Sequence, residues 1–446
     1  MMQNIKINNF ICLNDIDMDI KKLTILIGPQ SSGKSLISKL IYFFQEDVTK
    51  TYFKSIQNNG LKNELDKEVI EIFENYFDKS IWGKQQFIIR YQFDENGYFI
   101  IENKVSSRTS KLTLTLSKDL IRLFRVSKNR FSELLNRTNN DLKKSGKKTE
   151  SKYFLFRDFL YDVVPELYGS SIEPFIQFNN YIPASRSYFS AISKNIFSLL
   201  SENQNFDPFV KEFGRDFEFA CDLHLNNNKY REEIDDNEDD IKYQKILSNM
   251  KNDVHELTNK IINGDIFFEK DEYYIIKKNI KYKISSCSSG QQESFPLLTV
   301  LNTIPFFWQK YPQQYFIEEP EAHLFPEAQY DVLKIISNII NLTNSNCFIT
   351  THSPYILSAI NNMLLLSSII DFDEPNREKI KILIDNNIDY KTRLNFSDIS
   401  AFSLNNGEIV NICDTEEEMI GTNIIDSVSD IFNKEYDLLL NLFYGD

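Results

Sequence analysis

The hydrophobic residues at the start of the chain follow two different patterns. In 4–10 (NIKINNF) and 11–20 (ICLNDIDMDI), apolar and polar positions alternate, which predicts strands with one buried face. Residues 22–27 (KLTILI) form a continuous apolar run instead, which is typical of a strand buried on both faces. The run stops at 28–35 (GPQSSGKS), and the apolar residues that follow predict a helix.

A similar alternation of strands and helices returns from residue 264 onward. A hairpin or meander is expected first, and a helix then begins within 287–293 (CSSGQQE). A strand, a helix, a strand and a helix follow in 314–320, 326–342, 346–353 and 354–360. Short strands are predicted in 363–370, 379–385 and 399–404, and an amphipathic helix is expected to close the chain.

The central segment, 46–263, is polar, charged and mostly helical in pattern. A small hairpin is expected in it at 86–103, where DENG supplies a turn signal. The simplest interpretation is one α/β head formed by 1–45 and 264–365, interrupted by this mainly helical insertion. Residues 366–446 are expected to extend the head and to offer a surface for a partner or for oligomer formation.

The segment GPQSSGKS matches the pattern G-x-x-x-x-G-K-S between a predicted strand and a predicted helix, which is the context that a phosphate-binding loop requires. Backbone N–H groups of such a loop bind phosphates. Lys34 would reach the β- and γ-phosphates, and Ser35 would ligate Mg²⁺. The alternative, a chance glycine-rich turn, is disfavoured by this context. The predicted binding residues are Gly28, Pro29, Gln30, Ser31, Ser32, Gly33, Lys34 and Ser35.

Two adjacent carboxylates, Glu318 and Glu319, end the predicted strand 314–320. Neighbouring anions repel each other and resist burial, so a positive group is expected beside them. Near the phosphate-binding loop, Glu318 would hold Mg²⁺ through water and Glu319 would take a proton from an attacking water. Lys34 and Mg²⁺ would supply the positive charge. The alternative is a strand end that turns into solvent.

Two other segment ends carry candidate chemistry. Ser288, Ser289 and Gly290 lie at a predicted helix start, which makes an anion-binding cap, although an ordinary serine N-cap also explains them. His352 follows an apolar strand and would be able to donate a hydrogen bond to a γ-phosphate. A structural histidine at a strand end is the alternative, so neither motif is decisive alone.

The order of these motifs resembles that of the ABC-type ATPase head, and more narrowly its OLD, RecF and SMC branch. GPQSSGKS, SSGQQE, IEEPEAHLFP and TTHSP are close to the wording of that branch. The likeness covers about 1–45 and 264–365 and barely extends to the insertion. It implies an ABC-type P-loop head of the α/β class, with a mixed or parallel sheet and flanking helices, that uses ATP and Mg²⁺.

The resemblance also implies roles for single residues. Glu319 would be the hydrolytic base, His352 the switch histidine, and 321–324 the D-loop that contacts a second subunit. Glu318 stands where many ABC ATPases have Asp, which implies slow turnover. The segment that would touch the γ-phosphate of ATP in the second subunit is Ser288, Ser289, Gly290 and Gln291.

Three further residues have expected roles at or near the site. Gln177 is the candidate for the family's Q-loop glutamine near Mg²⁺. Arg186 lies in YIPASRS, a phrase that is similar to OLD-like ATPases, and it would either face the nucleotide, cap the next helix or pair on the surface. His323 is interpreted as structural or interfacial.

The sequence says less about the biological process that ATP hydrolysis would drive. OLD proteins carry a TOPRIM nuclease domain, but the segment after His352 shows no glutamate motif paired with a downstream Asp-x-Asp, and Asp385 and Asp389 fit a solvated strand end better. We therefore expect an ATPase without a nuclease site of its own. Such heads resemble ATPase subunits of anti-phage systems of the PARIS, Septu and retron-associated kinds. There a homo-oligomer, an ATP-bridged dimer or higher, controls a separate effector such as a nuclease or toxin.

A RecF- or SMC-like DNA-repair or DNA-clamping ATPase is the alternative. Its support is the segment 118–152, which holds eleven Lys or Arg against four Asp or Glu and includes KKSGKK at 143–148. A solvated face would also explain this charge, and the net charge of −14 argues against nucleic-acid binding by the whole surface. The long distance from Ser35 to Ser288 disfavours a transporter subunit.

Hydropathy and cysteine spacing bear on the cellular location of the protein. The N-terminus lacks the apolar run of a signal peptide, and no window approaches a membrane span, so a cytoplasmic protein without a membrane partner is expected. The five cysteines are far apart in sequence, and the four histidines show no metal-ligand spacing. Buried thiols are therefore favoured over a disulfide framework or a zinc site.

Overall fold

A computed structural model describes most of the chain. The described residues are 3–106, 110–145, 152–191, 207–225, 238–269, 272–309, 311–343, 345–370, 377–386, 388–421 and 439. Lys147 and Lys148 of the predicted basic segment, and almost all of the predicted closing helix, lie outside them. No helix among the described residues is both long and apolar enough to cross a bilayer.

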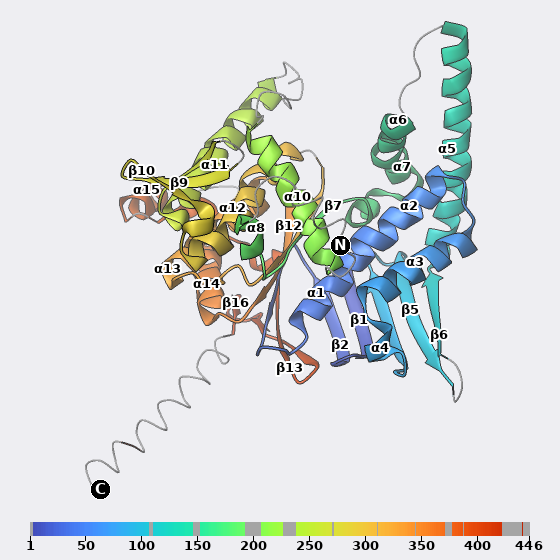
Figure 1. The fold of residues 1–446 in the computed structure, drawn as a ribbon, viewed down its shortest axis with the longest axis horizontal. Coiled ribbons are helices and arrows are strands. Elements are labelled where there is room, and N and C mark those ends of the chain that lie inside the picture. The colour runs from blue at the N-terminus through green and yellow to red at the C-terminus, as the bar shows by residue number, and fades with distance from the viewer. Residues whose placement is uncertain are drawn as a thin grey trace.

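One mixed, eleven-stranded sheet organises the molecule, in the order β6-β5-β4-β1-β2-β14-β13-β3-β12-β11-β7 (Figure 1). Its strands are β1 Gln3–Phe10, β2 Leu13–Ile20, β3 Leu23–Ile27, β4 Phe87–Gln92, β5 Tyr98–Val105, β6 Ser110–Leu116, β7 Phe178–Ile182, β11 Gln313–Glu318, β12 Ser345–Thr351, β13 Ile399–Asn405 and β14 Glu408–Asn411. Helices flank the sheet, so the predicted α/β class, a mixed sheet with flanking helices, is confirmed.

The five strands from β13 to β7 run parallel. Every residue of β3 and β11 is buried, because helices cover both faces of this half, and the apolar run of β3 is typical of such a strand. In-register pairing of β3, β12 and β11 brings their carboxyl ends to one edge of the sheet. Ligand sites of open α/β sheets occur at this edge.

The strands from β6 to β2 form an antiparallel half. Buried and exposed residues alternate along β4, and largely along β1, because one face packs on the core and the other meets solvent. The predicted hairpin is present as β4 and β5, and the sequence analysis missed β6 and β7. The segment 46–263 thus supplies strands to both ends of the main sheet, and 366–446 supplies β13 and β14 to its centre.

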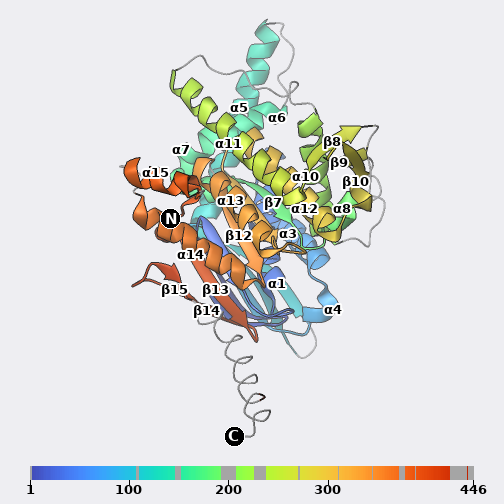
Figure 2. The ribbon, with the colours of Figure 1, turned by 90° about the vertical axis from the view of Figure 1, so that its left-hand side faces the viewer.

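Helices cover the sheet in two groups. Facing the larger aromatic core are α1 Lys34–Tyr42, a π-helical turn Phe43–Val48, α2 Thr49–Gln57, α3 Lys62–Tyr76 and α4 Lys79–Trp82. The opposite core contains residues of α10 Pro208–Leu225, α11 Glu238–Ile262, α12 Ser289–Phe307, α13 Pro326–Leu342 and α14 Pro354–Ile369, the last two in front of β12 and β13 in Figure 2. Pro326 and Pro354 each stand at a helix start, where proline's fixed φ is favourable.

The remaining elements lie around these layers. A three-stranded sheet precedes α12 and consists of β8 Asp265–Glu269, β9 Glu272–Lys277 and β10 Ile280–Lys283. The long helix α5 spans Lys118–Ser145. Shorter elements in the described ranges include α6 Lys152–Asp158, a π-helical turn Phe159–Val163, α7 Val164–Tyr168, α8 Ser187–Ala191, α15 Arg377–Asp385, β15 Cys413–Asp414 and β16 Met419–Ile420.

Two predicted strands are wrong. Residues 363–369 continue the helix that Pro354 starts, Ile370 caps its end, and 379–385 lie in α15. Both runs are rich in Leu or Ile, and a short apolar run alone does not distinguish a strand from a helix.

Candidate nucleotide-binding and hydrolysis site

The predicted phosphate-binding loop, 28–35, leaves the carboxyl end of β3 and enters α1. Ser31 and Gly33 have φ values of 60° and 105°, so two residues of the loop adopt left-handed backbone conformations before α1 begins at Lys34. A Cβ on Gly28 would lie 2.1 Å from the carbonyl oxygen of Leu404 in β13. The close approach explains the glycine, and the loop forms a concave backbone cradle at a helix start.

Lys34 occupies the centre of the site. Its ammonium group donates to the carbonyl oxygens of Gly28 at 2.9 Å and Pro29 at 2.8 Å, and it lies 3.2 Å from Nε2 of His352. Burial lowers the pKa of Lys34, while the nearby carboxylate of Glu319 opposes that effect. The lysine is therefore the positive charge that the adjacent carboxylates were expected to require.

Glu318 ends β11 with its carboxylate turned toward β7. One carboxylate oxygen accepts a hydrogen bond from the Tyr181 hydroxyl at 2.7 Å, and the other accepts from the backbone N–H of Ala184 at 3.2 Å. Burial, and then the charge of Glu318, raises the pKa of Tyr181 well above its usual value, so the phenol remains a donor. These partners offset the cost of burying Glu318, whose residue surface is only 5% exposed.

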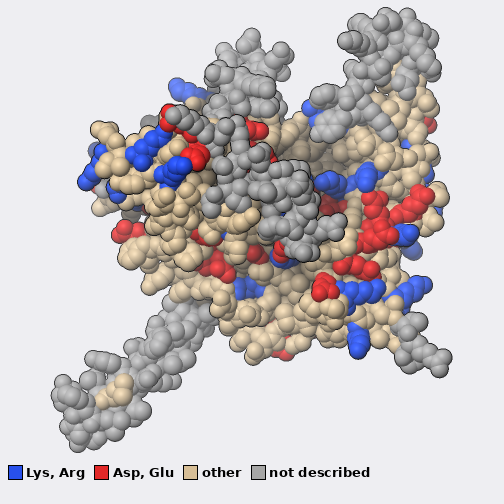
Figure 3. Space-filling model, viewed as in Figure 1, with Lys and Arg blue, Asp and Glu red and all other residues tan. Residues whose placement is uncertain are grey.

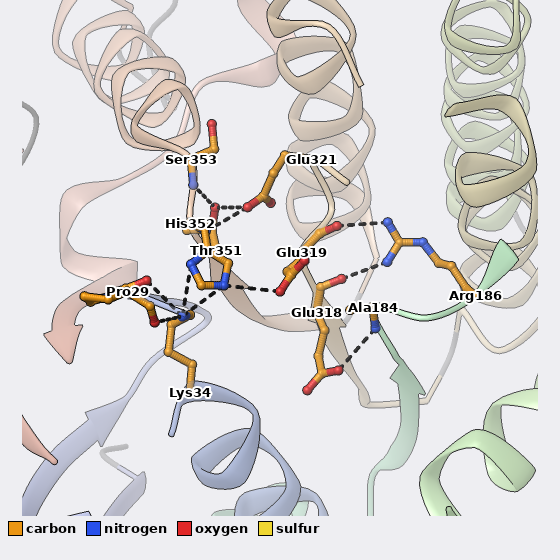
Figure 4. A network of polar contacts seen from close by, with 11 residues as sticks. Pro29, Lys34, Ala184, Arg186, Glu318, Glu319, Glu321, Thr351, His352 and Ser353 are labelled. Carbon is orange, nitrogen blue, oxygen red and sulfur yellow. Dashed lines mark hydrogen bonds and ion pairs between the residues drawn. The ribbon is translucent and has the colours of Figure 1, made fainter. Parts of the chain in front are cut away.

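Glu319 points in a different direction from its neighbour because its backbone is left-handed, with a φ of 45°. Its N–H still donates to the carbonyl of Thr350 at 2.8 Å, and its carboxylate lies 3.2 Å from Nε2 of His352. Figure 4 shows Lys34, His352 and Glu319 converging, while the carboxylate of Glu318 lies apart. The single backbone turn thus separates two adjacent anions.

His352, at the end of β12, is fixed by a residue that the sequence assigned only to the D-loop. One oxygen of the Glu321 carboxylate accepts both the His352 backbone N–H at 2.8 Å and the Thr351 hydroxyl at 2.7 Å. The other Glu321 oxygen is buried and has no hydrogen-bond partner within the described ranges. Glu321 therefore links the D-loop to the position of the histidine.

The start of α12 is a capped helix terminus. Ser288 is the N-cap, and it exchanges hydrogen bonds with Gln291, whose side chain also donates to the carbonyl of Ile262 at 2.7 Å. This confirms the serine N-cap interpretation. Ser288 and Ser289 are exposed, and within the described part of the chain no hydrogen bond joins them to the phosphate-binding loop.

The structure corrects the interpretation of Gln177. It precedes β7, and Phe178 pairs with Gln313 at the start of β11, so Gln177 lies at the opposite edge of the sheet from Glu318. Its side-chain N–H₂ donates to Asn179 at 3.2 Å. Proximity in sequence to YIPASRS suggested a place near Mg²⁺, but the intervening strand separates the two, and the prediction of a metal-side role is wrong.

Arg186 does not pair on the surface. It is fully buried, and its guanidinium donates to the carbonyl oxygens of Glu318 at 2.8 Å and Glu319 at 2.9 Å (Figure 4). Buried Glu293 accepts the Arg186 backbone N–H at 2.9 Å. Tyr181 and Glu293 were not predicted from the sequence. The one sequence feature that pointed to Tyr181 was its place with Arg186 in the short segment YIPASRS.

The residues present fit ATP and Mg²⁺. The Ser32 hydroxyl is buried in the loop and has no hydrogen-bond partner among the described residues, and the loop is shaped by glycines that leave no room for a side chain. The described ranges contain no cluster of three or more His, Cys, Asp or Glu side chains that could hold a metal ion. Mg²⁺ typically takes one or two carboxylates and shares substrate phosphates, so the donor set of Ser35 and Glu318 suits it.

Comparisons with known proteins were made at the level of whole structures, curated sequences and family models. Among solved structures, the Smc head bound to the C-winged helix domain of ScpA is similar, with a TM-score of 0.40 and 10% identity over 94% of this chain and 99% of that one. The SMC head domain from Thermotoga maritima has a TM-score of 0.34 and 11% identity over 92% and 98%. No curated protein matches the chain. The family model of the AAA ATPase domain matches residues 1–357. The chain therefore belongs to the AAA ATPase domain family.

Proposed function

We propose that this ATPase is a switch that binds ATP, self-associates across the bound nucleotide and hydrolyses it to control a separate effector in a bacterial anti-phage complex. The observation that supports it is the convergence of Lys34, Glu319 and His352 from three strand ends, with the start of α12 exposed elsewhere on the same chain. A second subunit would bring Ser288–Gln291 to the nucleotide of the first.

Each residue has a chemical task at the site. Lys34 binds the phosphates, and Glu319 takes a proton from the water that attacks the γ-phosphate. His352 lies between them and holds the carboxylate on one side. Mg²⁺, held by Ser35 and through water by Glu318, would neutralise phosphate charge. Because Glu318 also bonds to Tyr181 and Ala184, we expect slow turnover.

The surface beside the site supports self-association. Phe325, directly after the D-loop, is 75% exposed, and Tyr355, at the start of α14, is 56% exposed. Aromatic residues are enriched in the cores of protein interfaces. Both side chains would be buried if a second subunit covered the edge of the sheet that carries the site.

The decisive variant is Glu319→Gln, which keeps the shape of the side chain and removes the base. We expect ATP binding to persist, hydrolysis to fall by about a thousandfold and an ATP-bound assembly to accumulate. Turnover assays and light scattering with ATP measure these effects. Lys34→Ala is the control, because it should prevent both binding and assembly. Wild-type turnover in Glu319→Gln, or a monomer with ATP, would contradict the proposal.

The RecF- or SMC-like alternative is supported by α5, which projects from the body in Figure 1 and exposes Arg122, Arg125 and Arg137. On the face in Figure 3, however, acidic groups lie among the basic ones over α2 and α3, and the coloured residues show no continuous basic stripe. Duplex DNA binding that weakens with salt, and that is lost when Lys143, Lys144, Lys147 and Lys148 become Ala, would favour the alternative. Absence of binding at low salt would remove it.

A further inference from the structure

The turn that follows β11 is conformationally demanding. Glu319 and His323 have φ values of 45° and 58°, and both are non-glycine residues in the left-handed region. Backbone hydrogen bonds within the turn join Ala322 to Glu319 at 3.0 Å and Leu324 to Glu321 at 2.9 Å. Residues with a Cβ are strained in this region, so contacts from outside the turn are needed to hold Glu319 there.

Arg186 supplies those contacts. Its guanidinium donates to the carbonyls on both sides of the strained position, Glu318 at 2.8 Å and Glu319 at 2.9 Å, and also to Pro183 at 3.1 Å and to the carbonyl of Glu293 at 3.0 Å. All four acceptors are backbone carbonyls. A planar fork with five donors reaches such divergent acceptors, whereas the single ammonium of lysine does not.

Glu293 anchors this arginine to α12. Its buried carboxylate accepts the backbone N–H groups of Arg186 at 2.9 Å and Ser187 at 3.0 Å. The first turn of the same helix packs on the far end of the strained turn, since a Cβ on Gly290 would lie 2.7 Å from the carbonyl oxygen of His323. The helix α12 thus contacts the far end of the turn directly and its near end through Arg186.

We propose that Arg186 is a positioning residue that holds Glu319 in its hydrolytic orientation, and that Glu293 ties this arginine to α12. Arg186 contacts the backbone of Glu319 and not its carboxylate, so it acts on hydrolysis through the direction of that side chain. The proposal rests on the function proposed above for Glu319, and it assigns to YIPASRS the task of supporting the base from β7.

The first test is Arg186→Lys. Loss of the fork should let the Glu319 turn relax, and kcat for ATP should fall about 10- to 100-fold while the KM and the Kd of a fluorescent ATP analogue stay within about twofold. Arg215→Lys is the control, because Arg215 is a half-buried arginine on α10 whose ion-pair partners, Glu212 and Asp216, lie on the same helix. Its thermal stability should also fall, but its kcat should not.

A variant of Glu293 keeps the inference falsifiable if Arg186→Lys folds poorly, and a double variant tests whether the arginine acts through Glu319. Glu293→Gln loses one of two carboxylate acceptors and should lower kcat in the same direction, with the Kd unchanged. In a Glu319→Gln background, Arg186→Lys should not slow single-turnover hydrolysis further, because it acts through Glu319.

The outcomes separate this inference from the proposed function. If Glu319→Gln abolishes hydrolysis while Arg186→Lys lowers kcat no more than Arg215→Lys, only the positioning role is overturned. Multiplicative losses in the double variant, or a rise in Kd with unchanged kcat, would overturn it as well. If Glu319→Gln itself hydrolyses ATP normally, the proposed function fails first.

Discussion

The two halves of the main sheet are built differently. In the parallel half, helices cover both faces, and every residue of β3 and β11 is buried. In the antiparallel half, α1 to α3 and the turn between α1 and α2 cover one face, and the other carries exposed polar pairs such as Lys6 with Asp17. Both halves share the aromatic core beneath α1. They differ in where each half can carry polar and charged side chains.

A strand that is buried on both faces has little room for charged side chains along its length, because an unpaired charge in the interior is costly. Polar chemistry therefore gathers where such strands end, as with Lys34 after β3, Glu319 after β11 and His352 after β12. The antiparallel half spreads its polar residues over an open surface, where they pair locally. We infer that the parallel half carries the chemistry and the antiparallel half supports α1 beneath it.

Phe73→Ala would test this separation with the largest expected change in stability. Phe73 is fully buried on α3, and its ring contacts Phe10 and Phe87 of the antiparallel strands and Phe43 and Phe77 of the helices that cover them. Removing a buried phenylalanine ring costs about 3–5 kcal/mol of unfolding free energy. We expect that loss in urea unfolding, with kcat per folded molecule unchanged.

Phe73→Leu is the control, because it leaves a smaller cavity and should cost less. If Phe73→Ala instead lowered kcat while the protein stayed folded, the antiparallel half would have to take part in the chemistry. The comparison between the two halves would then fail.

The sequence predicted the residues of the site that lie in short, continuous motifs. The phosphate-binding loop, the paired glutamates and His352 each follow an apolar strand directly, so spacing alone places them at a strand end. The contacts that hold them were not predicted, because Arg186 is 107 residues from Glu293 and Tyr181 is 137 residues from Glu318. No local pattern encodes such pairs.

The errors have a related cause. Gln177 precedes a strand and Ala184 follows it, so the two are close in sequence but at opposite edges of the sheet, and only the register with β11 shows this. The run 379–385 is apolar enough for a strand, yet it forms a helix with exposed isoleucines, such as Ile382 at 61% exposure. Local sequence patterns therefore predicted which chemical groups the site contains better than they predicted where each element lies in the fold.

A smaller effect is expected where the helix of the phosphate-binding loop ends, at the π-helical turn. Burial, together with the neighbouring charge of Glu46, raises the pKa of Asp47 from 3.8 to about 8, although Tyr76 donates to it. Between these values the folded protein keeps the proton and the unfolded chain releases it, so stability falls as pH rises. Asp47→Asn removes this proton uptake. It should raise the unfolding free energy at pH 8 by on the order of 2 kcal/mol and change it little near pH 4.

Thermal unfolding followed from pH 5 to pH 8 would measure the change in slope. Some slope should remain in Asp47→Asn, because burial also raises the pKa of nearby Asp216 on α10 to about 7. Asp17→Asn is the matched control, since Asp17 lies on the open face of the antiparallel half and the Lys6 ammonium bonds to it. Partial burial opposes the shift, but interactions with Lys6 and Asn4 together lower the pKa of Asp17. This variant should therefore lose a little stability above pH 4 and leave the slope from pH 5 to 8 unchanged. Equal pH profiles for the two variants would mean that burial at the π-helical turn after α1 and exposure on the open face do not distinguish these carboxylates.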